Sequence, residues 1–195
     1  MALPAFGQSA AAQEVVAHID AVTGQAFVNR DADRLAAEAG LKVHRLDEVM
    51  TYGDGRLRLN FRDGTVITVG PNSRVLVQHY LDTLGGADSR APLLTLVVGI
   101  LRAAVPKIGS LGWSVQTRAA VASSRSTEWI MEARGETTSL VVIAGRVDVM
   151  NGAGEALRLT GGEGVDITLD ALMPATASRW AAARVIAFAE RTSLR

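Results

Sequence analysis

The side chains that could bind metals or act as general bases are few and far apart in this sequence. His18, His44 and His79 are separated by long stretches of chain. There is no cysteine, which removes thiolate chemistry and zinc sites built on sulfur. Because lone histidines are more often surface or satisfied interior residues than ligands, we expect no metal site.

Asp63 raises the question of acid–base chemistry, because it lies between two apolar runs in the segment NFRDGTVITVGPNSRV. Asp is favoured beside a turn glycine such as Gly64, since its carboxylate bonds nearby backbone amides. General acid–base catalysis needs a second positioned group, and the sequence marks none. We therefore interpret Asp63-Gly64 as a scaffold turn and predict that the protein is not an enzyme.

Hydroxyl and glycine clusters also lack the surroundings that catalysis or cofactor binding needs. The segment SSRSTEW, residues 123–129, has no G-x-S-x-G elbow around a nucleophile. The glycines at 152–154 and 161–164 lack the third glycine and the helix of a dinucleotide fingerprint, and no P-loop Lys-Ser/Thr follows them. We expect no cofactor and interpret these glycines as corners between strands.

The candidate binding residues are Arg102, Arg125, Glu128 and Trp180. An arginine within an apolar run must pair or reach water, because burying an unpaired charge is costly. We expect Arg125 to pair with Glu128. Two interpretations of these arginines remain open, internal clamps on loop carbonyls or contacts to a ligand.

Composition narrows the class of partner. The chain of 195 residues carries 20 basic and 20 acidic residues, and aromatic residues make up 5%. A net charge of zero and scarce aromatics argue against nucleic-acid binding. No apolar run reaches the ~20 residues of a membrane helix, so we expect no membrane span. Residues 1–14, with Ala10-Ala11-Ala12 as an A-x-A pattern, resemble the remnant of a signal peptide and predict a periplasmic or secreted protein.

Hydrophobic alternation predicts short strands joined at glycines. In RLRLNF, residues 56–61, leucine and phenylalanine alternate with polar residues, which is the pattern of a half-buried strand. Further strands are expected on either side of turns at Gly64, Gly70, Gly145 and Gly161. The run PLLTLVVGILRAAV is expected to form a buried strand or a short helix.

Three other segments carry local signals of secondary structure. Residues 15–29 predict a strand, a turn at Thr23-Gly24 and a second strand. Residues 30–43 predict a short helix or an irregular loop, and Gly53-Asp54-Gly55 predicts a turn.

An amphipathic helix is expected within residues 171–195. Pro174 ends the β region, and Trp180, Val185, Phe188 and Ala189 form one stripe of this helix, with Ser178 as its cap. The fold class is therefore all-β, a solenoid-like roll or a sandwich, with a C-terminal helix.

Four segments in order carry a more specific pattern: GRLRLNFRDGTVITVGPNSRV, LLTLVVGILRAAV, WSVQTRAAVASSRSTEWIMEA and TSLVVIAGRVDVMNGAGEALRLTGGEGVDI. This order closely resembles the FecR-like domain, with its phenylalanine-x-DGT/S turn and its final G-x-V-x-V…G…L-x-x-G-E strand group. The resemblance covers about Val15 to Ile167, within an expected domain of residues 15–170. Arg118 stands where the family usually has proline, and Ser126 where it usually has glycine.

The resemblance implies an extracytoplasmic sensing or interaction domain that is not an enzyme. In the best-known members this domain is the periplasmic part of a membrane-anchored sigma-factor regulator. We therefore expect a protein partner in the periplasm or envelope, docked through a sheet edge or the helix of Trp180. The alternative is a glycan or cell-wall binding module, in which Trp113, Trp129 or Trp180 stacks on sugars.

Overall fold

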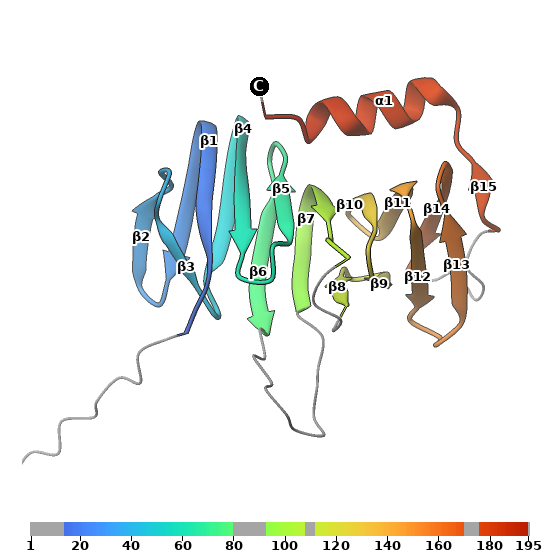
Figure 1. Ribbon diagram of the computed structural model, residues 1–195, viewed down its shortest axis with the longest axis horizontal. Helices are drawn as coiled ribbons and strands as arrows, with labels where there is room; N and C mark the ends of the chain where they lie inside the picture. The colour runs from blue at the N-terminus through green and yellow to red at the C-terminus, as the bar shows by residue number, and fades with distance from the viewer. Residues whose placement is uncertain (1–13, 80–92, 108–111, 170–175, 195) are drawn as a thin grey trace, which may run out of the picture.

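The computed structural model describes residues 14–79, 93–107, 112–169 and 176–194. These residues form fifteen strands and one helix, which confirms the predicted all-β fold with a C-terminal helix (Figure 1). The N-terminal segment predicted as a signal-peptide remnant and Pro174 lie outside the described residues, apart from residue 14.

Seven strands lie within the first 104 residues. They are β1 (Val15–Arg30), β2 (Asp33–Ala36), β3 (Lys42–His44), β4 (Glu48–Phe61), β5 (Val66–Val69), β6 (Arg74–His79) and β7 (Leu93–Ala104). In β4 the predicted alternation holds, because Leu57, Leu59 and Phe61 are buried while the residues between them are partly exposed.

Eight strands and the helix follow. They are β8 (Trp113–Gln116), β9 (Ala120–Ser124), β10 (Glu128–Arg134), β11 (Thr137–Ala144), β12 (Arg146–Asn151), β13 (Ala156–Thr160), β14 (Glu163–Thr168), β15 (Ser178–Arg179) and α1 (Ala182–Arg191). The strands on both sides of the corners at Gly145 and Gly161 are as the sequence predicts.

The strands pair into one continuous sheet that bends into two layers. The first layer has the order β3-β1-β4-β5-β7-β10-β11-β14-β15, and the second has the order β2-β1-β4-β6-β7-β8-β9-β12-β13. The long strands β1, β4 and β7 belong to both layers, one half of each strand in each layer. The two predicted forms were a sandwich and a solenoid-like roll, and the fold has features of both. Its layers face each other as in a sandwich, and its chain crosses repeatedly between them as in a solenoid.

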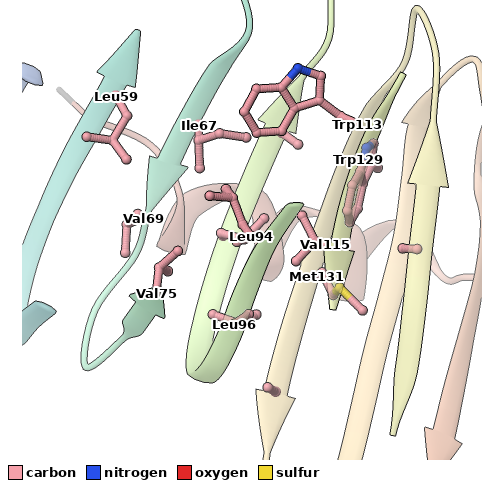
Figure 2. Close-up of a cluster of buried hydrophobic side chains, with 14 of the residues drawn as sticks. Leu59, Ile67, Val69, Val75, Leu94, Leu96, Trp113, Val115, Trp129 and Met131 are labelled. Atoms are coloured by element: carbon pink, nitrogen blue, oxygen red, sulfur yellow. The ribbon is translucent and has the colours of Figure 1, made fainter. Parts of the chain in front are cut away.

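The hydrophobic core lies between the two layers. Phe61 of the first layer and Trp113 of the second meet edge to face with ring centroids 4.5 Å apart. Trp129 of the first layer donates a hydrogen bond from Nε1 to Ser124 Oγ of the second, at 2.9 Å. Figure 2 shows Trp113 and Trp129 among aliphatic side chains of both layers, including Ile67 from β5 and Leu94 from β7.

The bend of β7 is at Gly99. Its φ of +97° is a conformation that residues with a Cβ rarely adopt. A Cβ at this position would also lie 2.5 Å from Ser73 Cα, at the neighbouring corner between β5 and β6. The Ser73 hydroxyl in turn accepts a hydrogen bond from the Ile100 amide at 2.9 Å. Adjacent corners are thus in direct contact, and only glycine fits between them.

Three weaker sequence predictions were wrong. Residues 15–29 form the single strand β1, where Gly24 lies at a bulge instead of a turn. Residues 30–43 contain β2 and β3 instead of a helix, because both pair with β1. Gly53-Asp54-Gly55 lies inside the continuous strand β4. In each case long-range pairing outweighs the local turn or helix preference.

The helix begins later than predicted. Ser178 belongs to β15, where it pairs with Gly164 of β14, and Ala181 is the residue that precedes the first turn of α1. No side chain caps this end of the helix. The predicted stripe of Trp180, Val185, Phe188 and Ala189 does face the β structure.

Replacing Gly99 with alanine should destabilise the protein by about 2–4 kcal/mol, because the methyl group meets Ser73 backbone and the φ is unfavourable. Gly152→Ala is the matched control, since an added Cβ there has no neighbour within 4 Å. Urea unfolding measures both. Equal stability of the two variants would contradict the corner contact.

Ser126, the position where the family usually has glycine, has a φ of +53°. Ser126→Gly should therefore stabilise the protein by roughly 0.5–1 kcal/mol, since glycine adopts this conformation without a Cβ penalty. Ser126→Ala retains the Cβ and should give no gain. Thermal unfolding of the three proteins tests this, and a gain for the alanine variant would show that backbone strain is not the cause.

Candidate interaction surface

The outer face of the first layer is covered by α1. Trp180 and Phe188 pack against Ile100, Ile130 and Val141, which point away from the main core. Figure 1 shows α1 lying along one side of the β structure. The helix therefore packs on its own β domain and covers the part of this face around Ile100, Ile130 and Val141.

Trp180 holds the C-terminal helix segment against the β domain. Its side chain is only 8% exposed, and its ring lies on Gly164 so closely that a Cβ there would clash. It meets the ring of Phe188 at a centroid distance of 5.1 Å, and the Arg184 guanidinium stacks on it at 3.4 Å. Trp180, predicted as a binding residue, thus packs mainly on its own domain.

Charged pairs fix the two ends of α1. Glu132, only 7% exposed, accepts hydrogen bonds from Arg191 at 2.7 Å and Arg134 at 2.8 Å. At the other end, Asp166 pairs with Arg184 at 2.6 Å. Burial raises the pKa of Asp166, but hydrogen bonds from Arg184 and Ser139 outweigh it and lower the pKa overall. The stabilisation from Asp166 is therefore present near neutral pH and lost as the pH falls through this lowered pKa.

Glu128 pairs with Arg102, and the predicted pair of Arg125 with Glu128 was wrong. Arg102 donates to Glu128 Oε1 from Nε at 2.9 Å and from Nη2 at 2.6 Å. Both residues are on the outer face of the first layer, on β7 and β10. Arg125 follows β9 in the second layer, so the corner at Ser126 separates it from Glu128.

Asp63 serves the scaffold in two ways. Its carboxylate accepts hydrogen bonds from the Thr65 amide at 2.9 Å and the Thr65 hydroxyl at 3.0 Å, within the turn that Gly64 completes at a φ of +80°. It also accepts the indole N–H of Trp113 from the other layer. This second bond was not predicted, because residues so far apart in sequence carry no local signal of it.

The histidines lie on separate strands. His18 is on β1, His44 on β3 and His79 on β6. Burial lowers the pKa of His44, and the charge of Arg30 lowers it further. Within the residues described, no three His, Asp or Glu side chains are close enough to hold a metal ion. No helix in the same residues is long and apolar enough to cross a membrane.

The outer face of the second layer is the surface that α1 leaves uncovered. One row of directly opposed residues crosses six strands of this face: Leu76, Thr95, Gln116, Val121, Met150 and Ala156. Val97 and Val98 are nearby on β7, where the pairing with β6 is irregular, and both are exposed. We call these eight residues the open face.

The open face is uncharged and partly apolar. Val97, Val98 and Met150 are 41%, 44% and 43% exposed, whereas the adjacent residues Leu96 and Val149 are buried. Beside it, Arg125 lines a cavity of about 410 Å³ with Gly112, Ser114, Ser123 and charged residues of β12 and β13.

The predicted glycan-binding tryptophans are not surface residues. Trp113 is 2% exposed, Trp129 is fully buried, and Trp180 lies under α1. Stacking of a sugar ring needs an open aromatic face, which none of the three provides.

The fold and its surfaces define a two-layer β domain with one covered face and one open face. The model of the FecR protein family matches residues 47–148, just over half of the chain. The chain therefore belongs to the FecR family, as the motifs around Asp63 and Gly145 predicted. No curated protein sequence matches it.

Two crystal structures, both described as "a putative anti-sigma factor" from Parabacteroides distasonis ATCC 8503, share the fold. Their TM-scores are 0.61 and 0.58, both at 17% sequence identity. The matches cover 73% of this chain and 63% and 64% of the other chains. This chain thus spans less than two thirds of their length, and at this identity the likeness concerns the fold alone.

Removing the Arg191 side chain should loosen α1, because buried Glu132 then keeps only the exposed Arg134 as a partner. We expect Arg191→Ala to cost about 1–3 kcal/mol. Arg134→Ala, which removes the 77% exposed partner, should cost less than about 1 kcal/mol. Urea unfolding, with hydrogen exchange of α1 amides, measures both. A larger effect for Arg134→Ala would contradict the conclusion that Arg191 is the more important partner of Glu132.

Proposed function

We propose that this chain is a non-enzymatic, extracytoplasmic FecR-family module that docks a protein partner on its open face. The docking would serve envelope signalling or assembly. The observation that carries the proposal is the difference between the faces: α1 covers the apolar residues of one face, and the other bears exposed apolar residues.

The composition of the open face suits a protein interface. Charged residues are depleted at the centre of such interfaces, and methionine is enriched. The row from Leu76 to Ala156 contains no charged side chain, and Met150 in the row and Val97 beside it provide exposed apolar area. A flat face of paired strands also offers a rigid platform, so little ordering entropy is lost on binding.

Two further features support the location and the absence of catalysis. Family membership and the A-x-A pattern at Ala10–Ala12 favour export, and a chain without cysteine is compatible with an oxidising compartment. The carboxylates of Asp63 and Glu128 are bonded within the scaffold, which leaves them poorly placed for acid–base work.

Site-specific photo-crosslinking from the open face tests the docking proposal. A photoreactive amino acid at Met150, in cells of the native host, should give a crosslinked adduct with a single protein partner. The same group at Ile186, which is 56% exposed on α1, is the matched control and should give none. The variant carrying Val97→Asp and Met150→Asp should bind the identified partner at least ~10-fold more weakly, since charges are disfavoured at an interface core.

Ile186→Asp places the same charge on the helix side and should leave the affinity unchanged. An adduct formed from position 186 but not from position 150 would contradict docking on the open face. An adduct that contains carbohydrate and no protein would favour the glycan-binding alternative.

A further inference from the structure

We propose that the cavity beside the open face binds a small ligand through a dianionic oxyanion, such as a phosphate monoester or a dicarboxylate. This site goes beyond the proposed docking of a protein and does not depend on it. The cavity is lined by Gly112, Trp113, Ser114, Ser123, Ser124, Arg125, Arg146, Asp148 and Arg158.

Strand register brings the polar side chains of the cavity together. Ser114 lies opposite Ser123, Ser123 opposite Asp148, and Asp148 opposite Arg158, so that one row crosses four strands on the outer face. The two serine hydroxyls are 2.8 Å apart and hydrogen-bonded. Rigid strands thus hold donors in fixed positions, as a preorganised binding site requires.

The single carboxylate of the row is already engaged. Asp148 accepts hydrogen bonds from Arg158 Nε at 2.7 Å and Nη2 at 3.3 Å, a two-point contact. This pairing aligns the Arg158 guanidinium and leaves Asp148 less able to neutralise other arginines.

Arg125 and Arg146 supply the uncompensated charge. In the described part of the chain, no carboxylate pairs with either guanidinium. Three arginines against one aspartate leave the cavity with a formal charge of +2, although the whole chain is neutral. Because Arg125 and Arg146 line the same cavity, their like charges disfavour each other, and a bound anion would relieve this cost.

Gly112 makes room for this arrangement. A Cβ there would lie 3.1 Å from Arg125 Cγ and 3.2 Å from its Nε, tighter than ordinary contact. The Arg125 side chain therefore lies along the Gly112 backbone at the wall of the cavity. A larger residue at position 112 would displace the Arg125 side chain from this wall.

The chemistry of the donors selects the class of ligand. Guanidinium groups present several N–H donors in a plane, which match the paired oxygens of carboxylates and phosphates. The Ser114 and Ser123 hydroxyls can add a neutral hydrogen bond to the same ligand. A volume of about 410 Å³ is within the range of small-molecule sites, so the oxyanion can belong to a larger molecule.

Calorimetric titration of the purified protein with inorganic phosphate and, separately, malonate tests the site. Each titration is done at constant ionic strength set with sodium chloride. We expect saturable binding of at least one of these anions, and a loss of at least ~10-fold in affinity for Arg125→Gln and for Arg146→Gln, because each removes charge-assisted hydrogen bonds.

The matched control is Arg118→Gln. It removes the same charge at the opposite end of the β8–β9 hairpin, where Arg118 is 68% exposed, and should bind as the parent does. Binding of phosphate alone assigns the site to phosphate groups, and binding of malonate alone to carboxylates. Absence of saturable binding of both anions would overturn the proposal, as would equal weakening by Arg118→Gln.

Stability without added anion gives a second readout. Because the like charges of Arg125 and Arg146 line one cavity, Arg146→Gln should unfold at the same or a higher temperature than the parent in chloride without added dianion. A clear loss of stability would mean that Arg146 has a structural role, and would count against the site. The variant carrying Val97→Asp and Met150→Asp should retain anion binding. Loss of partner binding and loss of anion binding can therefore be told apart.

Discussion

The bends of β1, β4 and β7 are the constraint on which the rest of the structure depends. Each of these strands runs through one layer, turns at a tight corner and continues in the other layer. The corners lie against one another, as the contact of Gly99 with Ser73 shows. Because neighbouring corners must fit within van der Waals distance, the two layers face each other at a fixed separation and enclose the core.

This construction also decides where the protein can interact. The short helix covers part of the outer face of the first layer, held by Trp180 beneath it and by the buried Glu132 at its end. The second layer is left open, with Met150 and Val97 at its surface and an arginine-lined cavity beside them. The two proposed binding surfaces are both created by strand register, whereas the carboxylates of Asp63, Glu128 and Glu132 are engaged in structural bonds.

The sequence predicts local features of this protein well and distant ones poorly. The alternation of Leu57, Leu59 and Phe61 and the glycine corners are local signals, and they led to the all-β fold and the family. Residues 30–43 were mispredicted because their strand conformation comes from pairing with β1. Likewise, Arg125 and Glu128 are close in sequence, but a corner places them in different layers. Rows that cross several strands, such as the open face, have no signature in sequence order.

Native-state hydrogen exchange along β7 tests the central claim most directly. The amides of Leu96 and Leu101 lie on opposite sides of the Gly99 bend and in different layers. If bent strands unite the layers into one cooperative unit, both amides should exchange only through global unfolding, with the same free energy of opening. If the Leu96 half opens at a clearly lower free energy than the Leu101 half, the two layers are separate units and the account is wrong.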